Sequence, residues 1–459
     1  MLTARRRGGH VRRLRRCESG AVTPAIALMF VVLAALIGLA IDTGRAHLVK
    51  SKLHYSLDAA GLAVGAKLDS TDLDAEVTEF VATNFPTGYV GATVTDVTPV
   101  LSADKSVLTI TATATVPTTF MKLVGIEEVS VAAESEITRT TTGLELVMVL
   151  DNTGSMSSQM SNLKGAAKEL VNILYGGANT VDDLYVGLVP FSQAVNVGSA
   201  RTGWIDAAHK DSLNWGPSGS SWAGCVEARG GGRDVTDDPP SAELFRVYYS
   251  PDSSNNDWIR SDGTYRTPLG TGTRGPNVYC PATVTPMTRQ KSTIVGAIDA
   301  MQAVGGTHVN VGAVWGWRML SPRWRGLWGG DMGTYNLPLD YNTELMEKAA
   351  VIMTDGANTV YDNIYSAYGF LSEGRLGTTS ISAGEDELDT RLLSVCTAMK
   401  NAGILVYTIA FNNPGATIQT MMQKCATQPD FYFNSPTASD LSTAFRTIGD
   451  ALSNLRVSR

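Results

Sequence analysis

Five oxygen-bearing side chains in three separate segments could hold a metal ion. The carboxylate of Asp151 and the hydroxyls of Thr153 and Ser155 alternate along one tight loop, DNTGS, directly after an apolar run. Thr307 lies in a turn, GGT, between two expected helices, and Asp355 follows the apolar run AAVIM in the sequence TDG. Carboxylate and hydroxyl oxygens are hard ligands that suit Mg²⁺, and also Mn²⁺ or Ca²⁺. We therefore expect a metal site if the fold brings the three segments together.

The charge of this ligand set indicates what the site would do. With two carboxylates acting partly through water, neutral hydroxyls become the main direct ligands, and one octahedral position stays open. A carboxylate from another protein could fill that position, so the residues predict metal-mediated docking of an acidic side chain. The alternatives are a simple turn for the DNTGS loop and a helix N-cap for Thr307.

The segments that would position these residues alternate between strands and helices. Buried strands are expected at 144–150, 185–190, 349–354, 404–411 and 431–433. Helices are expected at 158–174, 288–303, 309–320, 385–401, 416–424 and 437–455, and Ser321-Pro322 ends the third of them. The pattern predicts a doubly wound α/β domain over 143–459, with Asp151 at the carboxyl end of a strand, where such sheets bind ligands.

One stretch, 191–286, interrupts this alternation, and we interpret it as an insertion. It is rich in Gly, Ser, Asp, Asn and Trp, and it is too long for an ordinary loop inside a domain. Its tryptophans could form a small core or a binding surface; they are Trp204, Trp215, Trp222 and Trp258.

Four cysteines favour structural disulfides in an oxidising compartment. Cys225, Cys280, Cys396 and Cys425 allow three pairings, of which Cys225–Cys280 with Cys396–Cys425 keeps each bridge within a local segment. No cysteine lies in a CxxC motif or at metal-ligand spacing from a histidine, so the sequence does not indicate zinc.

The N-terminal region predicts a retained membrane anchor. Residues 21–40 contain no charge, and as a helix they would be about 30 Å long, the thickness of the hydrocarbon core of a bilayer. Seven arginines in residues 1–20 would stay in the cytoplasm, which leaves the chain after about residue 42 in the periplasm. A cleaved signal peptide is the alternative, but its apolar core is usually only about 7–15 residues.

A stalk and a small domain would separate this anchor from the α/β domain. Apolar residues at helical spacing continue the membrane helix to about residue 68. A short amphipathic helix at 74–85 and strands within 91–142, such as VLTITATATV, form a small α+β element over 69–142. Asp42-Thr43-Gly44 resembles half of an aspartic protease signature, but a second copy is missing, so a structural role is expected.

Several classes of function find no support in the sequence. Residues 21–459 carry 30 basic and 43 acidic side chains, a balance that disfavours nucleic acid as a partner. No GxxxxGK[ST] loop is present for nucleotide hydrolysis, and Ser155 stands outside a GxSxG motif. We expect His308, beside the candidate site, to be a surface residue, and Met301, Trp315 and Trp317 to belong to the core.

Two resemblances extend this interpretation. D-x-T-G-S with a distant Thr and TDG resembles the metal-ion-dependent adhesion site of von Willebrand factor A domains, usually D-x-S-x-S. Its five positions would be filled by Asp151, Thr153, Ser155, Thr307 and Asp355. The chain is also similar to TadG-like proteins of tight-adherence (Flp) pilus loci, through ESGAVTPAIALMF, IDTGRAHLVKSKLHYSLDAAGLA, GGTHVNVGAVWGWRMLSP and the pattern of the last two cysteines.

The resemblances imply a single-pass protein of the inner membrane that serves pilus assembly or adhesion and is not an enzyme. Its partner would be a protein that donates a carboxylate, such as another pilus-assembly component. Two alternatives remain: a metal-dependent hydrolase that uses the same oxygen cluster, for which the sequence names no general base, and a purely structural envelope protein.

Overall fold

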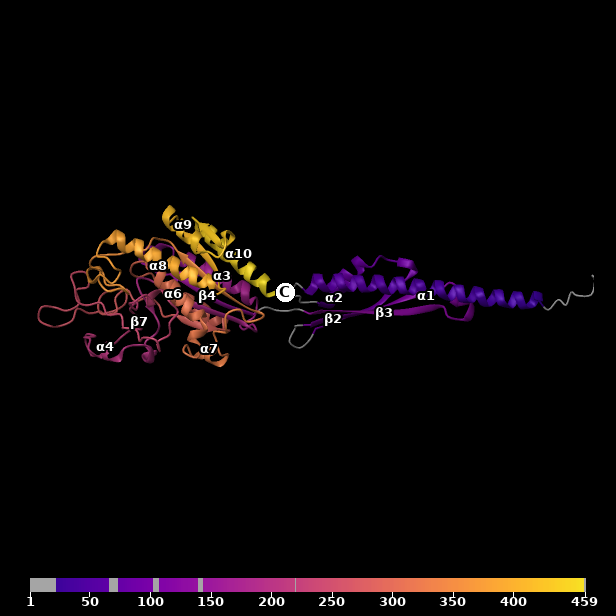
Figure 1. The fold of residues 1–459 in the computed structure, drawn as a ribbon, viewed down its shortest axis with the longest axis horizontal. Coiled ribbons are helices and arrows are strands. Elements are labelled where there is room, and N and C mark those ends of the chain that lie inside the picture. Colours follow the sequence, from indigo (N-terminus) through magenta and orange to yellow (C-terminus); the bar gives the residue numbers. More distant parts are fainter. Residues whose placement is uncertain (1–21, 66–72, 102–106, 139–142, 219, 458–459) are drawn as a thin grey trace, which may run out of the picture. The chain divides into compact units, whose positions relative to one another are not determined.

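The computed structural model describes residues 22–65, 73–101, 107–138, 143–218 and 220–457 (Figure 1). The chain divides into two compact units, 1–140 and 141–459, each with its own hydrophobic core. The expected basic cytoplasmic tip, 1–20, lies outside the described residues. The expected domain limits within the first unit stay a prediction, and the two units are described separately below.

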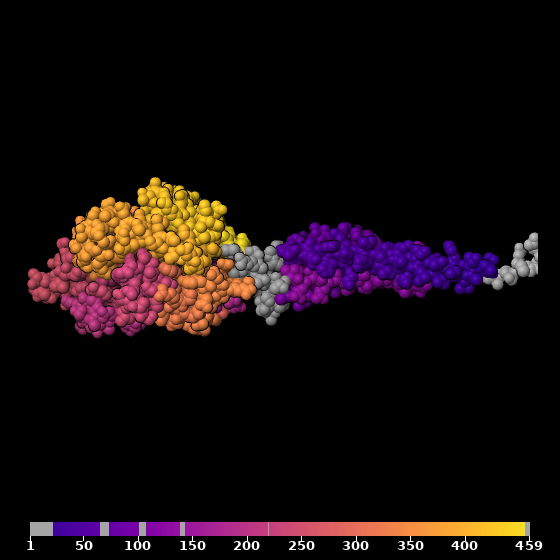
Figure 2. All heavy atoms as spheres, in the orientation of Figure 1, coloured from indigo at the N-terminus to yellow at the C-terminus, as the bar shows by residue number. Residues whose placement is uncertain are grey.

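The first unit is built on one long helix, α1 (Val22–Gly65). Among the described helices, α1 is the one that is long and apolar enough to cross a membrane. All its residues from 22 to 37 are exposed, whereas from Gly38 onward one stripe is buried at helical spacing. The expected anchor and the expected stalk therefore belong to one continuous helix, whose N-terminal part extends beyond the strands (Figure 2).

A three-stranded antiparallel sheet covers the buried stripe of α1. The sheet has the order β1 (Thr93–Leu101), β2 (Val107–Pro117), β3 (Glu128–Thr138), and the short helix α2 (Leu73–Asn84) packs beside it. In β2 the aliphatic residues alternate with threonines and are buried, as the period of two predicts. Leu53 and Leu57 of α1 share one core with Leu108 and Ile110 of β2, so helix and sheet pack as one body.

The second unit is a doubly wound α/β domain. Its sheet has the strand order β11-β10-β9-β4-β5, and these neighbours are parallel. The strands are β4 (Gly143–Asp151), β5 (Leu184–Phe191), β9 (Met346–Thr354), β10 (Leu405–Phe411) and β11 (Tyr432–Ser435). The predicted fold class is confirmed.

Helices cover both faces of this sheet. One face packs against α3 (Met160–Tyr175), α5 (Lys291–Ala300) and α10 (Ala438–Val457), and the other against α6 (Val309–Leu320), α8 (Ile381–Asn401) and α9 (Ala416–Cys425). In β4, Met148 packs on the face covered by α3, α5 and α10, and Val149 packs on the opposite face. Because both faces of the strand are buried, its sequence is an uninterrupted apolar run. The helix α6 begins and ends where predicted, before Ser321-Pro322.

Short elements at the edge of the sheet depart from the sequence-based expectation. The helix expected at 288–303 is shorter, because Thr285–Thr288 form β8, which pairs antiparallel with β5. Two further strands, β6 (Val195–Asn196) and β7 (Cys225–Val226), extend the sheet antiparallel. The small helices α4 (Ala207–Asp211) and α7 (Gly330–Thr334) were also not predicted.

The tryptophans of the segment 191–286 are packed inside the protein: Trp204 and Trp222 belong to the core of the domain, and Trp258 stacks on Tyr265 of the same segment. Trp204 lies 5.0 Å from Trp328 and 5.1 Å from Trp324 between ring centroids. Trp222 and Trp258 are buried as well, and Trp215 is half-buried. Both expected disulfides are present: Cys225–Cys280 lies within this segment, and Cys396–Cys425 joins α8 to α9.

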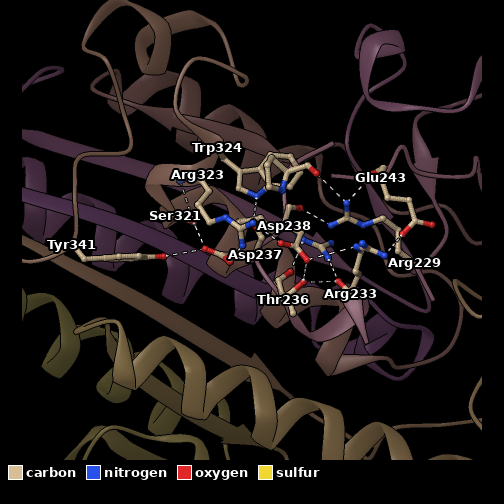
Figure 3. Close-up of polar contacts among 12 residues, drawn as sticks. Arg229, Arg233, Thr236, Asp237, Asp238, Glu243, Ser321, Arg323, Trp324 and Tyr341 are labelled. Carbon is tan, nitrogen blue, oxygen red and sulfur yellow. Dashed lines mark hydrogen bonds and ion pairs between the residues drawn. The ribbon is translucent and has the colours of Figure 1, made fainter. Parts of the chain in front are cut away.

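A charged network attaches the same segment to the end of α6 (Figure 3). The Asp237 carboxylate accepts hydrogen bonds from Ser321 Oγ at 2.5 Å and from Arg323 Nη1 at 2.7 Å. The Asp237 carbonyl accepts one from Trp324 Nε1 at 2.7 Å, and Arg323 also pairs with Asp238 at 2.5 Å. These bonds satisfy the charged and polar groups of Asp237 and Asp238 and hold this part of the segment against residues 321–324.

Candidate metal-binding site

The two candidate carboxylates lie at the carboxyl end of the sheet, because the strands that carry them are parallel neighbours. Leu150 of β4 pairs with Met353 of β9, so both strands end side by side. Asp151 is the last residue of β4 and Thr354 the last of β9. The Thr354 hydroxyl donates a hydrogen bond to Asp151 Oδ2 at 2.8 Å, which joins the two strand ends directly.

Hydrogen bonds join four of the five predicted ligands into one connected network. The backbone amide of Thr153 donates to Asp151 Oδ1 at 2.8 Å, which closes the DNTGS loop over the carboxylate. The hydroxyls of Thr153 and Ser155 lie 2.9 Å apart, and Ser155 Oγ donates to Asp355 Oδ1 at 2.6 Å. The fold therefore brings these four side chains together.

The fifth predicted ligand, Thr307, lies in a loop bonded to the DNTGS loop. The amide of Gly154 donates to the carbonyl of Gly305 at 2.9 Å, and the amide of Val304 donates to the carbonyl of Asn152 at 2.7 Å. Gly305 has a φ of +71°, which favours glycine at this turn. The loop that carries Thr307 is thus held against the loop that carries Thr153 and Ser155.

Thr307 does not cap α6, so the N-cap alternative is wrong. His308 occupies the cap position. The amide of Val309, the first residue of the helix, donates instead to Asn358 Oδ1 at 2.8 Å. Two hydrogen bonds fix the backbone of Thr307 against Thr359: its amide donates to Thr359 Oγ1 at 2.8 Å, and its carbonyl accepts from the Thr359 amide at 2.9 Å. The Thr307 hydroxyl is therefore not needed for local structure.

The two carboxylates of the site are buried close to each other. Asp151 is fully buried, and burial together with the neighbouring Asp355 carboxylate raises the pKa of Asp151 to about 7. Burial also raises the pKa of Asp355, which is 7% exposed. Two buried carboxylates that repel each other are stabilised by a cation between them.

The donors fit a hard divalent cation. Within the described parts of the chain, no three His, Cys, Asp or Glu side chains form a metal-binding group, so the donors here are two carboxylates and several hydroxyls. Such an all-oxygen set suits Mg²⁺, Mn²⁺ or Ca²⁺. Gly154 and Ser155 are exposed, so the site is open to a group from solvent.

The prediction for His308 was wrong. It is 2% exposed and is therefore a buried residue rather than a surface residue. Its Nε2 lies 3.1 Å from the Thr359 carbonyl, so this nitrogen carries the proton. Burial lowers the pKa of His308 to about 4, which keeps the ring neutral. Met301, Trp315 and Trp317 are buried, as predicted.

Some supporting residues were not predicted. Thr354 could have been recognised from its place at the strand end beside Asp151. Asn358 and Thr359, which hold the Thr307 loop, lie in an irregular segment without a periodic pattern. The residues to which they bond lie 49 and 52 positions away in the sequence.

The strand order and the DNTGS loop at the end of β4 give the second unit a fold of the von Willebrand factor A-like kind. For the first unit, residues 20–67 match the family described as putative Flp pilus-assembly TadE/G-like. The resemblance to this family is thus supported over the N-terminal helix. None of the curated protein sequences matches the chain at a significant level.

Solved structures of similar fold include two pilus proteins and a thread matrix protein. The vWF domain of the type V pili tip protein Mfa5 from Porphyromonas gingivalis is 12% identical, with 70% of this chain and 97% of that chain covered and a TM-score of 0.36. The pilus adhesin RrgA from Streptococcus pneumoniae is 11% identical, with 79% and 49% covered and a TM-score of 0.33. Proximal thread matrix protein 1 from the mussel byssus, with a zinc-occupied MIDAS motif, is 11% identical, with 70% of this chain and 47% of that chain covered and a TM-score of 0.30.

This chain spans about half the length of the last two proteins. With TM-scores this low, the fold assignment rests on the strand order and on the position of the DNTGS loop.

Proposed function

We propose that this protein is a membrane-anchored, non-enzymatic binding protein of pilus assembly or adhesion. It would hold Mg²⁺, or Mn²⁺ or Ca²⁺, at Asp151, Thr153, Ser155, Thr307 and Asp355, and would bind a partner whose acidic side chain completes the metal site. The observation that carries the proposal is the hydrogen-bonded network from Asp151 to Asp355, which lies at the carboxyl ends of β4 and β9 and contains two buried carboxylates.

The chemistry of the site supports binding of an acidic group. A divalent cation balances the two carboxylates, and the hydroxyls add no charge, so the bound ion keeps affinity for a further anion. The exposed Ser155 places that open position at the surface. A partner carboxylate would gain a direct bond to the metal that a neutral side chain could not form as strongly.

The N-terminal helix supports a place in the inner membrane. The exposed apolar part of α1 suits lipid better than water, and the arginines before it favour a cytoplasmic N-terminus. The remaining chain, with both disulfides, would then lie in the oxidising periplasm. The TadE/G-like match supports pilus-assembly components as partners.

A hydrolase that uses the same oxygen cluster would need a general base that substrate can reach. His308 is the imidazole next in sequence to the site, but it is buried and its Nε2 is bonded to a backbone carbonyl. His308 is therefore not placed to act as that base.

The test is capture of envelope proteins by the full chain in lipid nanodiscs, with Mg²⁺ or with chelator. The proposal predicts partners that are captured with Mg²⁺ and lost with chelator or with Asp151→Ala. Glu344→Ala is the matched control, since Glu344 is an exposed acid just before β9, at the opposite end of that strand. Partners captured equally by wild type and Asp151→Ala, in either buffer, would contradict metal-mediated docking.

A further inference from the structure

The turn between β2 and β3 exposes a cluster of apolar side chains. We define the hairpin tip as residues 118–127, which include a short 3₁₀ helix, Met121–Val124. Leu123 is 84% exposed, Val124 70%, Ile126 43% and Phe120 40%. Four large apolar side chains together at the end of a hairpin mark a surface that contacts something other than water.

The hairpin tip lies against the apolar, membrane-spanning part of α1. A Cβ atom on Gly38 would be 2.4 Å from Phe120 Cβ, so the Phe120 side chain rests on the helix at this glycine. Gly38 is the first buried residue of α1 and lies inside the uncharged run 21–40. In Figure 1 the β2–β3 end of the sheet lies along α1, and the N-terminal part of the helix continues beyond it.

Asp42 fixes the hairpin tip at this level of the helix. Its carboxylate accepts hydrogen bonds from the backbone amides of Thr119, at 3.0 Å, and of Phe120 and Met121, both at 2.8 Å. Arg45 Nη1 adds a bond to the Thr119 hydroxyl at 2.6 Å. The structural role expected for Asp42 is confirmed, and its partner is the tip.

Further hydrogen bonds satisfy backbone groups inside the tip. The amide of Leu123 donates to the Phe120 carbonyl at 3.0 Å, and the amide of Ile126 donates to the Met121 carbonyl at 3.1 Å. The Thr118 amide donates to the Glu127 carbonyl at 2.9 Å. Unsatisfied backbone groups are what keep irregular loops out of lipid, so these bonds make the tip fit for an apolar environment.

We propose that the hairpin tip inserts into the interfacial layer of the same membrane that α1 spans, in the leaflet from which the rest of α1 emerges. The inference rests on the proposed membrane anchor. Its occupant is lipid, because the apolar side chains of the tip continue the lipid-facing surface of α1 at Gly38. Lys122 can extend its ammonium to the headgroups, and the exposed Glu127 and Glu128 limit the depth. The first unit is then attached to the membrane at two points.

The test is fluorescence of single labelled cysteines on the full chain in phosphatidylcholine vesicles. The background is Cys17→Ser, since the other four cysteines are bonded in disulfides. A polarity-sensitive dye is placed by Leu123→Cys at the tip, by Leu33→Cys in the span, and by Tyr55→Cys as the matched control. Tyr55 is 68% exposed on α1, 13 residues beyond Asp42, or about 20 Å along the helix.

The proposal predicts that lipids brominated in the upper acyl chain remove most of the emission at positions 123 and 33 and none at 55. Aqueous iodide should quench only the label at 55. Emission at 123 that behaves like emission at 55, while 33 is quenched by lipid, would overturn the inference and leave the anchor intact. A water-like signal at 33 would instead overturn the anchor itself. Protection of the label at 123 from both quenchers, with a disulfide between two copies of the unlabelled Leu123→Cys variant, would assign the tip to self-association and reject lipid.

Discussion

Ser155 Oγ donates a hydrogen bond of 2.6 Å to Asp355 Oδ1, although the two residues are 200 positions apart. Neighbouring parallel strands, β4 and β9, cause this contact by ending at the same edge of the sheet. Without a metal, the hydroxyl compensates part of the carboxylate charge. With the metal that we propose, the same oxygen would turn its lone pair to the ion.

All eight tryptophans lie between residues 204 and 328, within the second unit. Tryptophan fluorescence of the full chain in nanodiscs therefore reports the unfolding of the von Willebrand factor A-like domain alone. This property is used in two of the measurements below.

Without metal, the stability of this domain should fall as the pH rises from about 4 to about 7. The pKa of Asp151 is near 7 in the folded state, because of burial and Asp355, and about 3.9 in the unfolded state, so the folded state binds the proton more tightly. Ionisation then costs the folded state roughly 4 kcal/mol at most. Asp151→Asn should reduce this dependence, with Asp355 supplying the remainder, and raise the unfolding temperature at pH 8 in chelator. A lower unfolding temperature for Asp151→Asn at pH 8 would contradict this account.

The Thr307 hydroxyl should matter for metal and not for folding. Thr307→Val keeps the two backbone bonds to Thr359 and removes only the hydroxyl. We expect Mg²⁺ affinity, measured by calorimetric titration, to fall about ten-fold or more. Thr307→Ser is the matched control and should bind like wild type. Equal affinities for the Val and Ser variants would show that Thr307 is not a ligand.

The bridge between α8 and α9 should contribute strongly to stability. Cys396–Cys425 has a sequence separation of 29, and a loop of that size predicts a stabilisation of about 3–4 kcal/mol through the unfolded chain. The double variant Cys396→Ser/Cys425→Ser should lower the free energy of unfolding by this amount in urea, followed by tryptophan fluorescence. Cys17→Ser should leave it unchanged. A loss below about 1 kcal/mol would refute the prediction.

The contact between Asp42 and the hairpin tip should control amide exchange at the tip. Asp42→Asn removes the charge and one acceptor from three amides, those of residues 119–121. Hydrogen bonds to a charged group contribute about 1.5–3 kcal/mol, so exchange at these amides should be roughly ten- to a hundred-fold faster. Amides of the central β2 residues, such as Ile110, are the internal control. Unchanged exchange at 119–121 would mean that Asp42 does not hold the tip.

Local patterns in the sequence predicted the elements that carry the fold. The alternation in β2, the apolar run of β4 and the Ser321-Pro322 stop of α6 each follow from side-chain burial or backbone chemistry within a few residues. The DNTGS loop could be placed for the same reason, since it directly follows the apolar run of β4.

Contacts between distant segments could not be predicted in the same way. β6 and β7 have two residues each and show no periodicity, so only their pairing partners define them. His308 is buried because the loop at Thr359 covers it, and the sequence of α6 does not reveal that loop. The partner of Asp42 lies 77 to 79 residues away, so its role could be expected but not its contact.

Metal-dependent thermal stability of the full chain in nanodiscs tests the central claim most directly. Tryptophan fluorescence would record the unfolding temperature of wild type, Asp151→Ala and Glu344→Ala, each with millimolar Mg²⁺ and with chelator. A ligand that binds only the folded state raises its stability. The metal site predicts a higher unfolding temperature with Mg²⁺ for wild type and Glu344→Ala, and no change for Asp151→Ala. The same shift in Asp151→Ala as in wild type, or no shift in wild type with Mg²⁺, Mn²⁺ or Ca²⁺, would contradict it.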